Sequence, residues 1–218
     1  TMGNLKREAL SLYLVTDRAL SLGRALTEIV RAAVRGGTTM VQLREKACDT
    51  RAFVELGRAV HDLLRPLGIP LIVNDRTDIA QVIGAEGVHI GQRDMAYADA
   101  RRLLGPEAII GLSVENDEQA RECVSFSGLD YIGASPVFAT PTKTDTARAL
   151  GLEGVRRLRQ IVGPTMPIVA IGGINSTNIQ EIIHAGADGV AVVSALCSAR
   201  EPEAAARALL HEINRAKS

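Results

Sequence analysis

The segment Val41–Lys46, with the sequence VQLREK, carries an amide, a guanidinium and an ammonium at every second position, on Gln42, Arg44 and Lys46. In an extended strand these three side chains would share one face. Two cations on one face suit an anionic ligand, because burying them without a counter-charge is costly. Two alternatives stay open. The segment could be a solvated strand edge, or nearby carboxylates such as Asp17 could neutralise the cations in a structural ion network.

Two aspartates, Asp75 in VNDR and Asp94 in GQRD, follow two consecutive short apolar runs. If those runs are neighbouring parallel strands, both carboxylates emerge at the same edge of the sheet. Two carboxylates with room for water suit Mg²⁺, which takes few protein ligands and completes its shell with water and substrate phosphate oxygens. The alternative is that Asp75 caps a helix and Asp94 closes a turn, since each precedes a helical segment.

Glycine and serine residues nearer the C-terminus predict a phosphate site. Gly172 and Gly173 follow the seventh apolar run, and Val193 and Ser194 end the eighth. Glycine allows backbone N–H groups to approach a phosphate, and a following helix N-terminus favours negative charge. We therefore expect a backbone phosphate cradle here, in addition to the cationic pocket around VQLREK.

The segment Thr140–Thr146, TPTKTDT, predicts a long polar loop in which Lys143 can close over an anion. A solvated loop without a ligand is the alternative. Ser113 ends the fifth apolar run, where its hydroxyl could contact a phosphate or cap a helix. His89 lies within a run and is interpreted as an interior, hydrogen-bonded histidine and not as a metal ligand.

Short β-branched runs and helical segments alternate along the chain and must position these residues. The predicted strands are Leu12–Val15, Thr39–Leu43, Pro70–Val73, Gly87–Ile90, Ala108–Leu112, Asp130–Gly133, Pro167–Ile171 and Gly189–Val193. The predicted helices include Gly23–Arg35, Thr50–Leu67, Asn116–Phe126, Gly151–Val162, Ser176–Ala185 and Pro202–Ala216.

Strict alternation of strands and helices predicts a parallel sheet, and eight units predict a single-domain (β/α)₈ TIM barrel over residues 1–218, with residues 1–11 as a short N-terminal extension. A doubly wound open sheet is the alternative, although no G-x-G-x-x-G motif follows the first strand. Nearly every run ends in polar residues or glycine. In a barrel all of these ends meet at one rim, where active sites lie.

Composition narrows the function classes. The 218 residues include 25 basic and 25 acidic side chains, which argues against a broad nucleic-acid-binding surface. Aromatic residues make up only 3%, so we expect an aliphatic core. Three widely spaced cysteines predict free thiols. The absence of a signal-peptide pattern and of a long apolar run predicts a cytoplasmic protein that uses no membrane. The two predicted anion sites indicate small-molecule substrates that carry phosphate groups. Assembly into a homo-oligomer stays open.

Eight motifs in order give the chain a family resemblance. They are YLVTD, VQLREK, VNDR, GVHIGQRD, GLS, DYIGASPVFATPTKTD, AIGGIN and AGADGVAVVSA. Through them the chain resembles the thiamine-phosphate synthases over residues 12–210. The resemblance implies a Mg²⁺-dependent enzyme that joins a hydroxymethylpyrimidine diphosphate to a thiazole phosphate. The products are thiamine phosphate and pyrophosphate, formed through a dissociative step with a pyrimidine methylene cation.

The resemblance also implies a role for each matching residue. The expected ligands of Mg²⁺ are Asp75 and Asp94, and the expected catalytic residues are Arg44, Lys46, Ser113 and Lys143. The pyrimidine diphosphate would contact Gln42, Leu43, Arg44, Glu45, Lys46, Asn74, Ser113 and Lys143. The thiazole phosphate would contact Thr140, Pro141, Thr142, Gly173, Val193 and Ser194.

Two positions depart from the family pattern: Ser135 stands where a glycine is common, and Glu115 stands near a common histidine. Both concern substrate detail more than reaction class. The rival interpretations are a thiazole tautomerase-like barrel, a non-catalytic phosphate-ligand-binding barrel, and a phosphosugar isomerase or epimerase, for which no acid–base pair is evident.

Overall fold

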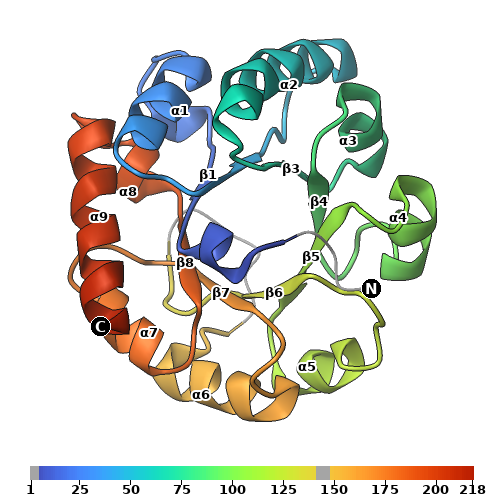
Figure 1. Ribbon diagram of the computed structural model, residues 1–218, viewed down its shortest axis with the longest axis vertical. Helices are drawn as coiled ribbons and strands as arrows, with labels where there is room; N and C mark the ends of the chain where they lie inside the picture. The colour runs from blue at the N-terminus through green and yellow to red at the C-terminus, as the bar shows by residue number, and fades with distance from the viewer. Residues whose placement is uncertain (1–4, 141–147) are drawn as a thin grey trace.

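The computed structural model describes residues 5–140 and 148–218, and these form a closed barrel of parallel strands surrounded by helices (Figure 1). Each strand pairs with the next, and β1 closes the barrel against β8 through the pairs Leu12–Val190 and Leu14–Val192. The strands are β1 (Leu12–Val15), β2 (Met40–Leu43), β3 (Leu71–Asn74), β4 (Gly87–Ile90), β5 (Ile109–Val114), β6 (Tyr131–Ala134), β7 (Ile168–Ile171) and β8 (Gly189–Val192). The predicted (β/α)₈ barrel is confirmed.

The helices lie on the outside of the barrel (Figure 1). The α-helices are α1 (Leu26–Arg35), α2 (Thr50–Leu64), α3 (Thr77–Ile83), α4 (Tyr97–Leu104), α5 (Asp117–Cys123), α6 (Gly151–Val162), α7 (Ile179–His184), α8 (Ser194–Cys197) and α9 (Pro202–Lys217). Short 3₁₀ turns are η1 (Arg7–Leu10), η2 (Ala19–Ser21) and η3 (Arg65–Leu67). None of the described helices is both long and apolar enough to cross a membrane.

Alternation along the strands divides the core into two layers. In β1, Leu12 and Leu14 face the helices, whereas Tyr13 and Val15 face the barrel interior. The outer layer is aliphatic, as predicted. The barrel interior is also mostly aliphatic, but it holds Tyr13 and Tyr131, which are fully buried and are the largest buried side chains of the described chain. The three cysteines are free thiols, as predicted.

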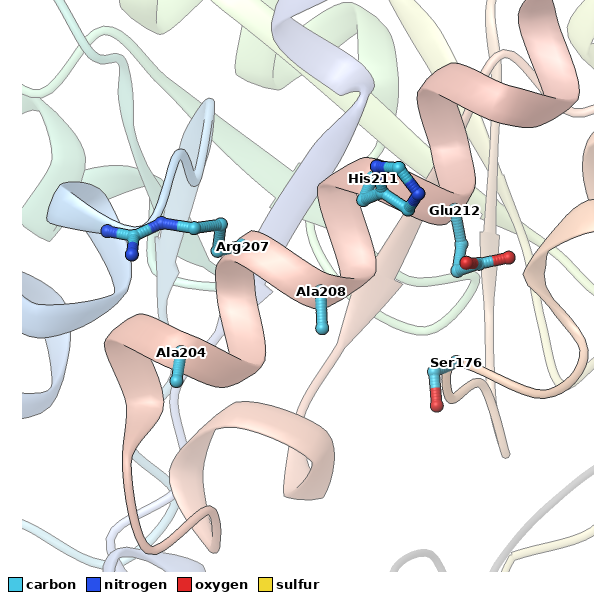
Figure 2. Close-up of a pocket in the computed structure, with 6 residues that line it drawn as sticks. All are labelled: Ser176, Ala204, Arg207, Ala208, His211 and Glu212. Carbon is cyan, nitrogen blue, oxygen red and sulfur yellow. The ribbon is translucent and has the colours of Figure 1, made fainter.

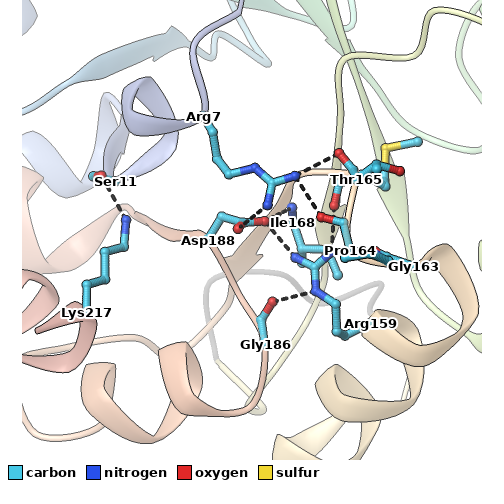
Figure 3. A network of polar contacts seen from close by, with 11 residues as sticks. Arg7, Ser11, Arg159, Gly163, Pro164, Thr165, Ile168, Gly186, Asp188 and Lys217 are labelled. Atoms are coloured by element: carbon cyan, nitrogen blue, oxygen red, sulfur yellow. Dashed lines mark hydrogen bonds and ion pairs between the residues drawn. The ribbon is translucent and has the colours of Figure 1, made fainter.

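Residues 5–11 of the N-terminal extension cover the end of the barrel at which the strands begin, opposite the strand C-termini. Figure 1 shows its short turn η1, in dark blue, lying across the barrel. Leu10 is fully buried and joins the interior cluster. Arg7 donates to the Asp188 carboxylate at 3.2 Å and to the carbonyl oxygens of Pro164 and Thr165 (Figure 3). The described part of this segment therefore closes the end of the barrel at which the strands begin.

Two aspartates that each precede a strand form hydrogen bonds between neighbouring elements at this end of the barrel. Asp188, before β8, accepts from the Ile168 N–H of β7 at 2.8 Å and from the Arg159 guanidinium of α6 at 2.6 Å (Figure 3). Asp130, before β6, accepts from the Ile110 N–H of β5 at 2.8 Å and from the Arg101 guanidinium of α4 at 2.9 Å. The AGADG segment is therefore a turn on the rim opposite the polar strand ends, as predicted.

Candidate active site

The polar residues that follow β2 do not continue the strand. The expected alternation through Lys46 is wrong, because β2 ends at Leu43 and a loop places Arg44 and Lys46. Gln42 faces the barrel interior, where its side-chain amide donates to the Tyr13 hydroxyl at 2.9 Å. Leu43 is fully buried in the outer layer, as predicted, so any contact that it makes with a ligand would come from its backbone.

Arg44 is held in a partly buried ion pair with Asp17. The Nη1 to Oδ2 distance is 3.1 Å, and the two side chains are 20% and 14% exposed. The Arg44 N–H also donates to the Thr16 hydroxyl at 3.0 Å. Glu45 pairs with Arg18 at 3.0 Å, and only 3% of the Glu45 side chain is exposed. Arg44 therefore has a fixed carboxylate partner at the rim, and the Glu45 side chain is turned away from an anionic ligand.

Asp75, directly after β3, has a strained backbone. Its φ is +63°, one of two positive values outside glycine in the described chain. The Arg76 N–H donates to the Asn74 carbonyl oxygen at 2.7 Å, which makes Asp75 the centre of a tight three-residue turn. Such strain is found where a side chain must be held in one direction. The turn directs the Asp75 carboxylate to the rim, where it contacts the Lys46 ammonium.

Asp75 and Asp94 come together, as expected for two carboxylates on neighbouring strand ends. Burial raises the pKa of Asp94, and its hydrogen bond with Asp75 raises it further. Burial also acts on Asp75, but the hydrogen bonds from Asp94 and Lys46 outweigh it and lower the pKa of Asp75. Two carboxyl groups whose pKa values move apart in this way share one region of negative potential. A divalent cation would satisfy both.

The donor set at this point fits a metal that takes few protein ligands. Among the described residues, no group of three or more His, Cys, Asp or Glu side chains could hold a metal ion. Asp75 and Asp94 would supply two carboxylates and leave the other positions to water and ligand oxygens. This is the coordination that Mg²⁺ prefers.

Ser113 lies at the same rim, near the end of β5. Its hydroxyl is 2.9 Å from His89 Nε2, and the Gln92 side-chain amide donates to its carbonyl oxygen at 2.7 Å. His89 is 4% exposed and its Nδ1 lies 3.0 Å from the Tyr131 hydroxyl. The prediction of an interior, hydrogen-bonded histidine is confirmed. Asn74, the last residue of β3, is half-buried and directly precedes Asp75.

Four of the six residues expected at the thiazole phosphate are described, and they follow β6, β7 and β8. Gly173 follows β7 with a φ of +67°, and a Cβ at this position would lie 2.8 Å from the Phe138 Cβ. Val193 is half-buried and follows β8, and the exposed Ser194 begins α8. Thr140 is half-buried. Pro141, Thr142 and Lys143 lie outside the described residues.

Two tyrosines near the site are absent from the sequence-based prediction. Tyr13 and Tyr131 link Gln42 to His89 through their hydroxyl groups. The sequence does contain a feature that could have identified these two tyrosines. The chain has only three tyrosines, and two of them occupy inward-facing strand positions where an aliphatic residue is usual.

A hollow lies on the outer surface, along α9. Figure 2 shows Arg207, His211 and Glu212 on this helix, with Ser176 from the segment before α7. None of the described residues predicted to bind a ligand lines this hollow. The candidate active site is therefore the rim formed by the strand C-termini.

The fold and the rim define the class of protein. It is a (β/α)₈ barrel whose cations and paired carboxylates, at the C-terminal ends of the strands, suit an anionic ligand together with a divalent cation. The family model described as thiamine monophosphate synthase matches residues 12–196. The chain belongs to this family and is an enzyme.

Known proteins agree with this assignment. The thiamine-phosphate synthase of Albidiferax ferrireducens is 54% identical over 203 residues, which cover 93% of this chain and 91% of that protein. The thiamine-phosphate synthase of Syntrophomonas wolfei is 54% identical over 199 residues, 91% of this chain and 94% of that protein. The solved thiamine phosphate pyrophosphorylase of Pyrococcus furiosus has a TM-score of 0.87 and 38% identity, and covers 97% of this chain and 99% of its own.

Proposed function

We propose that this chain is a thiamine-phosphate synthase. It would join 4-amino-2-methyl-5-hydroxymethylpyrimidine diphosphate to a thiazole phosphate, with release of pyrophosphate. The observation that carries the proposal is the contact of Lys46 with Asp75 and of Asp75 with Asp94, which follow β2, β3 and β4. Arg44, after β2, and Ser113, near the end of β5, lie at the same rim. A site for a monophosphate alone would not need two cations and two carboxylates together.

Each substrate would have its own part of the rim. The pyrimidine diphosphate would bind the side chains of Gln42, Arg44, Lys46, Asn74, Ser113 and Lys143, and the backbone at Leu43 and Glu45. The thiazole phosphate would bind Gly173, Val193 and Ser194 after β7 and β8, with Thr140, Pro141 and Thr142, which follow β6 in the sequence. The two ligands would then face each other across the mouth of the barrel.

The reaction exchanges one bond for another at the pyrimidine methylene carbon. The bond from this carbon to the diphosphate oxygen breaks, and the diphosphate leaves with the electron pair. The thiazole nitrogen then donates its lone pair to the methylene cation and forms the new C–N bond. That nitrogen carries no proton, so no general base is required. Arg44, Lys46, Ser113 and Lys143 would stabilise the charge that grows on the leaving oxygen.

Asp75 and Asp94 would hold the Mg²⁺ of this site. When bound, the ion would supply further positive charge next to the diphosphate. Lys46 already contacts Asp75, so the Lys46 ammonium and the metal ion would interact with the same carboxylate. This arrangement supports a role for Lys46 on the diphosphate itself, once a metal occupies the two aspartates.

One assay separates the proposal from its rivals. The purified chain would be incubated with both precursors and Mg²⁺, with either precursor omitted, and with the metal chelated, while pyrophosphate and thiamine phosphate are measured. We expect both products only in the complete mixture. Tautomerisation of the thiazole phosphate without pyrophosphate release would instead indicate a tautomerase-like barrel. Binding of both precursors without any product would indicate a non-catalytic one.

A further inference from the structure

A chain of hydrogen bonds crosses the barrel interior and joins two of the proposed substrate-binding residues. The Gln42 side-chain amide donates to the Tyr13 hydroxyl at 2.9 Å, and the two tyrosine hydroxyls are 2.8 Å apart. The Tyr131 hydroxyl is 3.0 Å from His89 Nδ1, and His89 Nε2 is 2.9 Å from the Ser113 hydroxyl. The five residues come from β2, β1, β6, β4 and β5, so the chain of contacts spans the barrel.

The interior is shaped to hold these rings. His89 and Tyr131 stack with their ring centroids 5.6 Å apart and an interplanar angle of 29°. Gly111 of β5 makes room for Tyr131, because a Cβ there would overlap the Tyr131 ring. Gly133 of β6 similarly borders His89, since a Cβ there would lie 3.1 Å from the His89 Cε1. Larger side chains at these glycines would displace the rings.

Burial keeps both phenols protonated. Tyr13 and Tyr131 are 0% exposed, and burial raises the pKa of each far above its ordinary value. A buried hydroxyl that keeps its proton must donate it to a partner, since an unpaired buried donor is costly. Each tyrosine therefore both accepts and donates within the chain of contacts.

The amide of Gln42 sets the direction of the hydrogen bonds. An amide nitrogen can only donate, so the Tyr13 oxygen accepts from it. The Tyr13 proton then goes to the Tyr131 oxygen, and the Tyr131 proton goes to His89 Nδ1. An Nδ1 that accepts leaves the proton of the neutral imidazole on Nε2, which donates to the Ser113 oxygen. The Ser113 O–H is then directed to another acceptor at the rim.

We propose that Tyr13, Tyr131 and His89 are positioning residues that fix the imidazole tautomer of His89 and thereby make Ser113 a hydrogen-bond donor towards the diphosphate. The inference rests on the proposed function for the identity of that anion.

Kinetics of a double-mutant cycle test the coupling. Tyr131→Phe keeps the ring and removes only the hydroxyl, so we expect kcat/KM for the pyrimidine diphosphate to fall about ten-fold, with the KM for the thiazole phosphate unchanged. In a Ser113→Ala background the same change should have no further effect. An equal loss in both backgrounds would mean that Tyr131 acts only through the general structure, and would overturn the inference.

A matched control removes a hydroxyl elsewhere. Tyr97→Phe loses the hydrogen bond from the Tyr97 hydroxyl to the Ser127 carbonyl oxygen, 2.8 Å long and on the outside of the barrel. We expect its rates to match those of the unchanged protein. A ten-fold loss in this control as well would show that the assay responds to any lost tyrosine hydroxyl and would remove the kinetic support.

The tautomer can be observed in the unchanged protein without any measurement of activity. The ¹⁵N spectrum of the histidine side chains distinguishes a proton on Nε2 from one on Nδ1, and comparison with His89→Gln assigns the signals. We expect His89 to carry its proton on Nε2. A proton on Nδ1 would overturn the inference even if the chain makes thiamine phosphate. Conversely, failure to make thiamine phosphate, with the proton on Nε2, would contradict the proposed function alone.

Discussion

The Lys46 ammonium, from the loop after β2, contacts the Asp75 carboxylate after β3. A cation proposed to bind the diphosphate is thus paired with a carboxylate proposed to bind the metal. The two side chains are 53% and 24% exposed, so solvent screens the pair and its contribution to stability is about 1 kcal/mol or less. A pair this weak can separate when a metal and a diphosphate enter.

Lys46→Met should therefore have opposite effects on metal binding and on catalysis. Removing the ammonium frees Asp75, so we expect Mn²⁺ alone, a paramagnetic probe for the Mg²⁺ site, to bind about two- to five-fold more tightly. The rate of product formation should fall about a hundred-fold, because a charge that stabilises the leaving group is lost. Electron paramagnetic resonance titration and steady-state kinetics measure the two effects.

A lysine at the other end of the barrel provides the control for this experiment. Lys217 donates to the Ser11 hydroxyl at 3.1 Å, and Lys217→Met should change neither quantity. Unchanged Mn²⁺ affinity in Lys46→Met would show that Asp75 is not the carboxylate at which the metal binds.

Arg44→Gln separates a ligand-binding role from a structural ion network. Arg44 is 20% exposed beside Asp17, and its loss removes charge-assisted hydrogen bonds to the diphosphate while it leaves Asp17 to repel that anion. We expect the KM for the pyrimidine diphosphate to rise about ten-fold or more, with the KM for the thiazole phosphate unchanged. A lower melting temperature together with unchanged KM values would favour the network.

Gly173→Ala tests the requirement for glycine in the proposed phosphate cradle. The φ of +67° and the contact of a Cβ with Phe138 at 2.8 Å both oppose alanine. Gly68→Ala is the matched control, because Gly68 has a φ of +65° and no atom within 4 Å of where a Cβ would lie. The control should lose about 1 kcal/mol of stability. Gly173→Ala should lose more and also raise the KM for the thiazole phosphate. Equal losses and an unchanged KM would count against the cradle.

Two arginines of α4 form ion pairs that should contribute differently to the free energy of unfolding. Asp130 has 1% of its side chain exposed and accepts from both Arg101 and the Ile110 N–H. Asp99, which pairs with Arg102, is 52% exposed. We expect Asp130→Asn to cost about 2 kcal/mol in the free energy of unfolding and Asp99→Asn less than about 0.5 kcal/mol. Equal losses in denaturant titrations would contradict the assigned role.

The fold is predictable from the sequence because alternation of strands and helices is a strong signal. All eight predicted strands are present, with ends that differ by up to two residues. The helices α3 and α4 follow Asp75 and Asp94, where the sequence predicts helical segments without giving their bounds. They span seven and eight residues, so each offers few apolar positions at helical spacing.

The site is predictable only in part. The sequence indicates which strand ends are neighbours, but it does not indicate which side chains from different strands contact each other. The proximity of Asp75 and Asp94 follows from neighbouring parallel strands. The pairing of Lys46 with Asp75 does not, since it depends on the end of β2 at Leu43 and on the turn at Asp75. Nor can the spacing indicate that Tyr13 and Tyr131 meet inside the barrel, 118 residues apart.

Phosphorus NMR of a single reaction tests the central claim most directly. The purified chain would be mixed with equal amounts of the pyrimidine diphosphate and the thiazole phosphate in Mg²⁺, and the ³¹P signals followed with time. We predict that one pyrophosphate and one thiamine phosphate appear for each pair of precursors consumed. Persistence of both precursor signals, or loss of the diphosphate signal without thiamine phosphate, would contradict the account.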